Sequence, residues 1–126
     1  METGLVFNRH GGVIAWHVPE DRSAGFLPDS PTLWQILWEN RVELGGFAHT
    51  HPGDGIASPS TTDVTTFAAI ELALGKRLVW PILTFAETVY TEWVGPSALA
   101  YTVGYKSQAG FELPHELLAK LRDLSR

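Results

Sequence analysis

The chain has 126 residues, 44% of them hydrophobic, and a formal net charge of −5. This length is typical of one compact domain that buries roughly two-thirds of its unfolded surface, so we expect a single domain over residues 1–126. Lys and Arg total only nine, which argues against nucleic-acid binding, and the absence of cysteine excludes disulfides and thiolate metal sites. No apolar run reaches the ~20 residues of a membrane span and no signal peptide is visible, so we expect a cytoplasmic protein.

Residues 5–8 and 13–18 are apolar and predict a β-hairpin, because the intervening Arg9-His10-Gly11-Gly12 supplies glycines that accept a positive φ. A helix is predicted from Pro31 to Leu44, since a serine suited to the N-cap precedes a proline at the first helical position. We expect Gly45-Gly46 to end this helix. Four of its apolar side chains should face the core: Leu33, Ile36, Leu37 and Val42.

A short strand is predicted over residues 47–51, and a second helix from Thr61 to Leu74, capped by Ser60 and ended by Gly75. Pro81 indicates that its strand lies at a sheet edge or carries a bulge. The remaining predicted elements are strands over residues 78–85, 89–94 and 101–105 and a helix over residues 114–124. This order of elements predicts an α+β (mixed α/β) fold, with a sheet flanked by helices.

The chemically most informative segment, residues 49–63, reads His-Thr-His-Pro-Gly-Asp-Gly-Ile-Ala-Ser-Pro-Ser-Thr-Thr-Asp. His49 and His51 lie two residues apart on a predicted strand, so their side chains project from the same face. Asp63 lies in the first turn of the following helix, close enough to the strand end to be a third ligand. Two His and one carboxylate with an open fourth position form a ligand set typical of catalytic zinc. We therefore predict a Zn²⁺ site at His49, His51 and Asp63.

These residues resemble the signature of the JAMM/MPN metallopeptidase family (the Mov34/JAB domain), in its prokaryotic JAB form. That family shows a catalytic Glu on an early strand, then His-x-His-Pro, then Ser-x-x-Asp after a short loop. His49, His51 and Pro52 match the second part, and Pro59-Ser60 with Asp63 matches the third, with a loop one residue longer than usual. The resemblance implies an MPN/JAB-like sheet of the cytidine-deaminase-like kind, flanked by helices, in a zinc metallopeptidase.

The Glu of the family signature must come from an upstream strand. Prokaryotic members often begin their first strand with Glu-Thr-Gly-Gly, which Glu2-Thr3-Gly4 resembles, with Leu5 in place of the second glycine. Glu2 is thus the predicted general base, and Glu20, which follows the second strand, is the alternative. Ser60 is predicted either to hydrogen-bond a developing oxyanion or only to cap the helix, and one hydroxyl could serve both roles.

The other histidines and other metal-binding families explain the sequence less well. His10 and His115 lie in a predicted turn and at a helix start, where solvated side chains are expected. His17, in a strand, is expected to be a satisfied structural residue. A metallo-β-lactamase motif, His-x-His-x-Asp-His, fails because position 53 is Gly and no histidine comes directly after Asp54. An amidohydrolase barrel would need ~250 residues.

The resemblance implies a zinc-dependent isopeptidase or peptidase that cleaves at the C-terminal tail of a ubiquitin-like or sulfur-carrier protein. In such chemistry the cation lowers the pKa of a coordinated water toward ~7. Glu2 would accept that water's proton and return it to the departing amine. Two alternatives stay open: release of a small amino acid such as cysteine from a sulfur-carrier protein, and a catalytically silent MPN scaffold that binds a ubiquitin-like partner. No nucleic-acid or membrane partner is expected.

Overall fold

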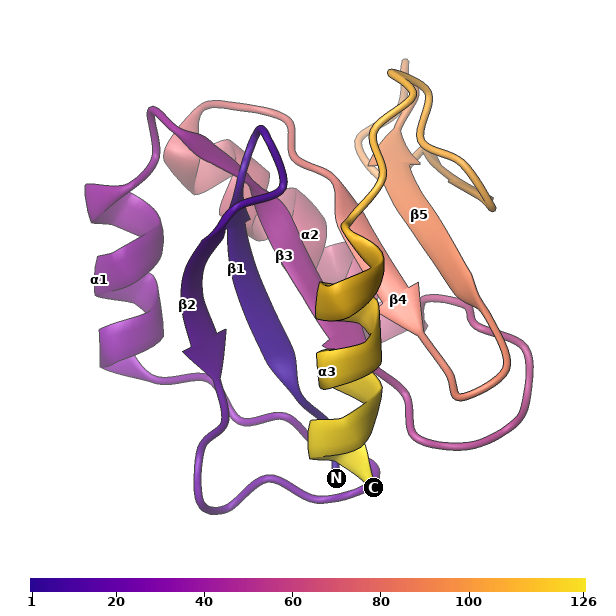
Figure 1. The fold of residues 1–126 in the computed structure, drawn as a ribbon. Helices are drawn as coiled ribbons and strands as arrows, with labels where there is room; N and C mark the ends of the chain where they lie inside the picture. Colours follow the sequence, from indigo (N-terminus) through magenta and orange to yellow (C-terminus); the bar gives the residue numbers. More distant parts are fainter.

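Six strands of the chain form a single mixed sheet in the order β2-β1-β3-β4-β5-β6 (Figure 1). The computed structural model describes residues 1–126. All neighbouring strands run antiparallel except β3 and β4, which are parallel because α2 connects them as a crossover helix. None of the helices has the length and apolar character needed to span a bilayer. The elements are β1 (Gly4–Asn8), β2 (Val13–His17), α1 (Pro31–Glu39), β3 (Leu44–Thr50), α2 (Thr61–Leu74), β4 (Trp80–Leu83), β5 (Thr88–Trp93), β6 (Tyr101–Gly104) and α3 (His115–Ser125).

The sheet carries helices on both faces. Leu5, Val6 and Phe7 of β1 are all fully buried, and strand alternation divides them between two apolar layers. Val6 packs in the layer that includes residues of α1 and α2, whereas Leu5 and Phe7 pack in the layer that includes residues of α3. Figure 1 shows α3 in front of the sheet and α2 behind it. A strand covered on both faces needs apolar side chains on both, which explains the continuous apolar run.

The two ends of the chain lie together, as Figure 1 shows. The Met1 amino group donates a hydrogen bond to the Ser125 carbonyl at 2.7 Å. The next backbone N–H, that of Glu2, donates to the Ser23 carbonyl at 2.6 Å. The first residues are therefore held in place by the end of α3 and by the loop after β2, and Glu2 has a defined position.

Most predicted elements are confirmed. β1 and β2 pair as the predicted hairpin, and Gly11 in its turn has φ +82°. Helix α2 has the predicted bounds, and Gly75 ends it in the left-handed region at φ +69°. The later strands and the C-terminal helix also occur where they were predicted, with small shifts at their ends. The α+β class with a helix-flanked sheet is thus confirmed.

The first helix is shorter than predicted, because α1 ends at Glu39 rather than at Leu44. Asn40 terminates it: its backbone N–H and its side-chain Nδ2 both donate to the Ile36 carbonyl, the latter at 2.8 Å. The chain then turns away, so Val42, predicted to be in the core, is 74% exposed. A side-chain amide that competes for the helical carbonyl thus ends the helix before the glycines are reached.

The two glycines predicted to end the helix instead belong to β3. A Cβ on Gly46 would lie 1.8 Å from the Val79 carbonyl oxygen, and one on Gly45 would lie 2.6 Å from the Asn8 carbonyl oxygen. These glycines let the strand approach its neighbours closely, which is a packing requirement rather than a helix stop.

The prediction for Pro81 is also wrong. Its strand β4 lies inside the sheet between β3 and β5. Pairing of β4 with β3 consists of His49↔Ile82 and Thr50↔Leu83, with an isolated bridge at Gly46↔Val79 in the same register. Pro81 lies between these points and has no N–H to donate, which accounts for the interruption without an edge position or a bulge.

Candidate metal centre

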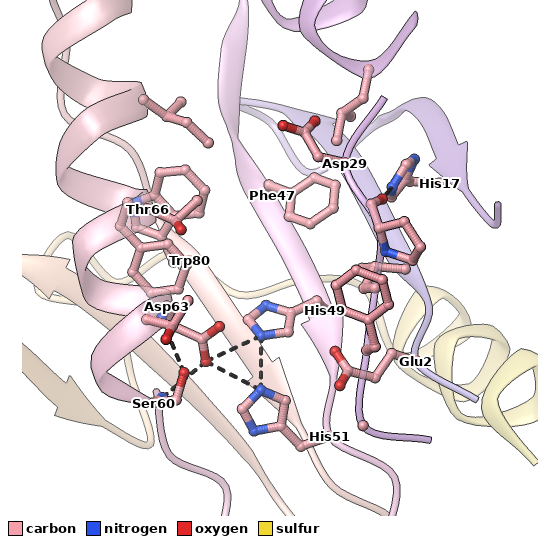
Figure 2. A pocket seen from close by; sticks show the side chains of 18 of the residues that line it. Glu2, His17, Asp29, Phe47, His49, His51, Ser60, Asp63, Thr66 and Trp80 are labelled. Atoms are coloured by element: carbon pink, nitrogen blue, oxygen red, sulfur yellow. Dashed lines mark hydrogen bonds and ion pairs between the residues drawn. The ribbon is translucent and has the colours of Figure 1, made fainter. Parts of the chain in front are cut away.

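Strand β3 and the start of α2 bring His49, His51 and Asp63 together at one end of the sheet (Figure 2). His49 belongs to β3, and His51 follows its last residue. The backbone N–H of His51 donates to the Leu83 carbonyl at 2.7 Å, which keeps the chain aligned with β4 beyond the assigned strand. Both imidazoles therefore project from the same face, as their spacing predicted.

The three side chains form a triangle of ligand atoms. His49 Nε2 lies 2.9 Å from His51 Nε2, and Asp63 Oδ2 lies 3.5 Å from the first nitrogen and 3.2 Å from the second. Ligands that bind tetrahedral zinc at about 2.0–2.1 Å are separated from one another by about 3.3–3.4 Å. The donor set and its spacing fit one divalent cation.

The helix cap of α2 orients the Asp63 carboxylate. Ser60 Oγ accepts a hydrogen bond from the Asp63 N–H at 3.0 Å, and Asp63 Oδ2 accepts one from the Ser60 N–H at 2.9 Å. This reciprocal capping box confirms the predicted cap and fixes the same oxygen that faces both histidines. Because Ser60 Oγ serves as an acceptor here, its own proton is free for another partner.

Glu2 lies beside the histidines on the side opposite to Asp63 (Figure 2). It is 9% exposed, and one of its carboxylate oxygens lies within 4.8 Å of a ring nitrogen of each histidine. Glu20, the alternative base, is exposed and does not line the cavity that contains the histidines. The structure therefore brings Glu2, and not Glu20, to the site.

Two carboxylates could complete a ligand set with His49 and His51. Asp63 Oδ2 lies 3.5 Å and 3.2 Å from the two ring nitrogens, and a Glu2 carboxylate oxygen lies within 4.8 Å of both. The Asp63 separations are close to those between ligands of a tetrahedral ion, whereas a base that acts on a coordinated water can be one water away. Asp63 is favoured as the third ligand by these separations and by its cap, and Glu2 is favoured as the proton acceptor by its raised pKa.

The surroundings separate the two carboxylates in acidity. Burial opposes ionisation of Asp63, but hydrogen bonds with His49 and His51 outweigh it and hold the pKa of Asp63 far below its usual range. Burial raises the pKa of Glu2, against the attraction of the two histidines. The hydrogen bond to Asp63 raises the pKa of His51, although burial opposes the change. Carboxylates driven apart in pKa are typical of an anionic ligand beside a proton acceptor.

The three remaining histidines behave as predicted. His17 is buried, and its Nε2 lies 2.5 Å from the Pro28 carbonyl oxygen, so it is a satisfied structural residue in the wall of the cavity. His10 and His115 are exposed.

The histidines open into a cavity of about 740 Å³ between α1, α2 and the sheet. One end is polar and contains Glu2, His51, Ser60 and Asp63. The rest of the lining is mainly apolar, apart from His17, Asp29, Thr62 and Thr66, and no Lys or Arg lines the cavity. The apolar lining includes Leu33, Leu37, Phe47, Phe67, Ile70 and Trp80.

The prediction missed Glu71, which is 2% exposed on the core-facing side of α2. Its carboxylate accepts hydrogen bonds from the Leu78 N–H at 2.8 Å and from Trp80 Nε1 at 3.0 Å. Arg77 Nη1 donates at 3.1 Å, and the Tyr101 hydroxyl is a fourth donor. Its position one residue after the buried Ile70, on the apolar stripe of α2, is the sequence signal that could have revealed it.

Glu71 is connected to His49, one of the candidate ligands, through aromatic side chains. It fixes the Trp80 indole, whose ring stacks on Phe67 with centroids 4.3 Å apart. Phe67 in turn meets the His49 ring edge-on at 6.2 Å. The imidazole of one candidate ligand is therefore held against a rigid aromatic wall.

Comparison with known protein families and with curated proteins finds no match to the chain.

Proposed function

We propose that the chain is a zinc-dependent isopeptidase or peptidase of the JAMM/MPN type, which cleaves at the C-terminal tail of a ubiquitin-like or sulfur-carrier protein. The observation that carries the proposal is the triangle of two imidazole nitrogens and one carboxylate oxygen, with separations of 2.9–3.5 Å. Its three residues, with Pro52, Ser60 and an N-terminal Glu2, follow the order of the motif that the chain resembles. The mixed sheet with helices on both faces is compatible with an MPN-like fold.

The proposed chemistry is hydrolysis of an amide. A divalent cation at this site supplies Lewis-acid chemistry, because it acidifies water and polarises a carbonyl. Asp63 and the two histidines would hold the cation, and the cap at Ser60 keeps the carboxylate turned toward it. Glu2 would take the proton of the attacking water and deliver it to the departing amine. Burial raises the pKa of Glu2, which makes it a stronger base than an exposed carboxylate.

Ser60 has a second proposed role as an oxyanion donor. Its hydroxyl lines the cavity beside Asp63, and its proton is not used by the cap. Removal of a single oxyanion donor in other hydrolases costs about 2.7–4 kcal/mol of transition-state stabilisation.

The cavity favours an internal amide over release of a terminal amino acid. A released amino acid carries an α-carboxylate, which Arg or Lys normally pairs. None of the lining residues is Arg or Lys. Arg22 lies beside the first residues of the chain, but its guanidinium already donates hydrogen bonds to the Glu2 carbonyl at 3.2 Å and to the Thr3 hydroxyl at 2.7 Å. Release of cysteine from a sulfur carrier is therefore the weaker candidate.

The experiment combines metal analysis with cleavage of a ubiquitin-like conjugate. Wild type is expected to bind one zinc per chain and to cleave. Asp63→Ala should lose both properties, whereas Glu2→Gln should keep zinc and lose about 10²–10⁴-fold in rate. Glu20→Gln, at the exposed glutamate outside the cavity, is the matched control and should resemble wild type.

Two results would overturn the proposal: wild type without stoichiometric zinc, or Asp63→Ala with intact cleavage. Zinc binding without cleavage of any conjugate, together with retained binding of the ubiquitin-like protein, would select the silent scaffold instead.

A further inference from the structure

We propose that three buried hydroxyl groups, those of Thr3, Thr50 and Ser125, position Glu2 beside the candidate metal centre. We call these three residues the hydroxyl cluster. Each is at most 2% exposed, and none of them lines the cavity that contains the histidines. The inference rests on the proposed function, because it concerns the residue that would act there as the general base. It adds positioning residues that act on Glu2 from outside the cavity.

Thr50 is the residue between the two histidines. Because side chains alternate along a strand, its hydroxyl points to the face opposite to that of His49 and His51. On that face it meets the last turn of α3, where Ser125 Oγ lies 2.7 Å from Thr50 Oγ1. Figure 1 shows α3 on one side of the sheet and α2, which carries Asp63, on the other. The strand that carries the histidines is thus held from behind by α3.

The Thr50 hydroxyl also takes the place of a backbone acceptor between β1 and β3. The Thr50 N–H donates to the Thr3 carbonyl at 3.0 Å, as in an ordinary antiparallel pair. The return bond, from the Thr3 N–H at 2.8 Å, goes to Thr50 Oγ1 rather than to a carbonyl oxygen. Pairing therefore continues one residue before Gly4, the first residue of β1, and a side chain secures the residue next to Glu2.

Each proton of the hydroxyl cluster has an acceptor. Ser125 Oγ lies 2.7 Å from the Leu121 carbonyl oxygen, which can only accept, so the single Ser125 proton goes there. Thr50 Oγ1 and Thr3 Oγ1, the latter 2.9 Å from Ser125 Oγ, can then each donate to a lone pair of Ser125. Thr3 Oγ1 in turn accepts a hydrogen bond from Arg22 Nη1 at 2.7 Å. A buried network in which every group is paired is rigid and specifies one arrangement.

The loop after β2 completes the hold on Glu2. The Glu2 N–H donates to the Ser23 carbonyl at 2.6 Å, and Arg22 Nη1 donates to the Glu2 carbonyl at 3.2 Å. Both polar groups of the Glu2 backbone are therefore hydrogen-bonded, and its side chain lies beside the two histidines (Figure 2). This placement matters because a displacement of about 1 Å at a reacting group can cost about 10²-fold in rate.

The chain offers a matched set of variants. Thr50→Val removes the hydroxyl with little change of shape, and Thr50→Ser restores it. Thr91→Val is the control, because Thr91 is another fully buried strand threonine whose hydroxyl has no hydrogen-bond partner. Ser125→Ala removes the cluster's link to α3 without a change in the strand, so it serves if Thr50→Val does not fold.

The first measurement is cleavage of a ubiquitin-like conjugate by the zinc-loaded protein. Thr50→Val and Ser125→Ala should lower kcat about 10–100-fold, with KM and zinc affinity within about twofold of wild type. Thr50→Ser and Thr91→Val should resemble wild type. In a Glu2→Gln background, Thr50→Val should cause no further loss, because it acts through Glu2. Equal kcat values for Thr50→Val and Thr91→Val, or a full additional loss in the Glu2→Gln background, would overturn the inference.

The second measurement is amide hydrogen exchange in the metal-free protein and does not depend on activity. In Ser125→Ala and Thr50→Val the Glu2 N–H should exchange about tenfold faster than in wild type. The His51 N–H, which donates to the Leu83 carbonyl, should keep its rate, whereas a general loss of stability would accelerate both. Unchanged exchange at Glu2, or equal acceleration at Glu2 and His51, would overturn the inference.

The two measurements separate a failure of this inference from a failure of the proposed function. Selective acceleration at Glu2, with no cleavage of any conjugate by wild type, would support the positioning role and reject the proposed hydrolysis. Cleavage by Thr50→Val at the rate of wild type would reject the positioning role and leave the proposed hydrolysis intact.

Discussion

Helix α2 carries two carboxylates in opposite surroundings. Asp63, in its first turn, faces two imidazoles and one backbone N–H at the mouth of a cavity. Glu71, further along, is buried and receives hydrogen bonds from two side-chain N–H groups, one backbone N–H and the Tyr101 hydroxyl. Both carboxylates contact nearby groups. Only the groups beside Asp63, the two imidazoles, can also bind a metal ion.

The difference teaches which buried acid is structural and which is available for chemistry. At Glu71 every partner is a donor held by the fold, so the carboxylate is complete without a ligand. At Asp63 two ring nitrogens and a carboxylate oxygen converge, and neutral imidazoles offer lone pairs that a cation can take. A cation would add little at Glu71, and it would complete the candidate site at Asp63.

The largest expected effect concerns Glu71, the carboxylate that is fully hydrogen-bonded by the fold. Glu71→Ala removes the acceptor of four donors, leaves several of them unpaired in the core, and should lower the free energy of unfolding by about 3–5 kcal/mol. Urea unfolding in the presence of a chelator measures this change without a contribution from metal.

Asp63→Ala serves as the comparison under the same conditions and should cost about 1 kcal/mol, mainly through the lost capping box. Equal losses for the two variants would remove the distinction between the two carboxylates.

The second prediction concerns the candidate metal site at Asp63. Zinc at one hundred times its dissociation constant should raise the free energy of unfolding of wild type by about 2.7 kcal/mol, because the metal binds only the folded triangle. Asp63→Ala should show no such rise, and Glu71→Gln, although less stable, should keep it. Unfolding curves with and without zinc provide the measurement. A zinc-dependent rise of the same size in Asp63→Ala would show that Asp63 is not a ligand.

A smaller effect should show whether the Ser60 cap of α2 also positions Asp63 for zinc binding. Ser60→Ala removes the cap of α2 and should cost about 1 kcal/mol of stability. It should also weaken zinc binding about 10-fold, because the lost hydroxyl no longer holds the turn that carries Asp63, although the backbone N–H of residue 60 still contacts the carboxylate.

Ser30, which accepts the Leu33 N–H at 3.0 Å, caps α1 in the same way and provides the control. Ser30→Ala should show the same stability loss with unchanged zinc affinity. If both caps leave zinc affinity unchanged, the Ser60 cap is only a helix cap.

The same contrast explains what the sequence could and could not predict. His49, His51 and Asp63 were found because strand alternation and a helix cap fix side-chain direction within a few residues. Glu71 was missed because its donors converge on it only when the chain turns back after α2. Three of them lie within nine residues of Glu71, and the fourth, Tyr101, lies 30 residues further along the chain. The predicted end of α1 was wrong for a related reason. The Asn40 side chain donates a hydrogen bond to the Ile36 carbonyl and ends the helix before the glycines, and helix propensity does not account for that contact.

Long-range packing also decided the position of Pro81. Its strand lies inside the sheet because β3 and β5 flank it, and the missing N–H is tolerated as a local break in pairing. Local rules describe the cost of the proline but not the burial that offsets it. The set of apolar side chains that line the cavity likewise depended on which helices pack against the sheet.

The smallest predicted effect concerns the pH dependence of the stability that the Tyr101–Glu71 hydrogen bond contributes. Burial and the hydrogen bond to Glu71 raise the pKa of Tyr101 above its usual value of about 10. The protonated phenol is therefore favoured by folding. Its stabilising contribution is fully present below about pH 10 and is lost as the pH rises through the folded-state pKa. The stability advantage of wild type over Tyr101→Phe, about 1 kcal/mol at neutral pH, should shrink between about pH 10 and pH 12.

Urea unfolding at a series of pH values measures this advantage, with Tyr105→Phe, at a tyrosine that is 70% exposed, as the control. An advantage that stays constant over that interval would mean that the Tyr101 hydroxyl does not donate to Glu71. The carboxylate would then have one donor fewer, and the contrast with Asp63 would rest on Arg77, Leu78 and Trp80 alone.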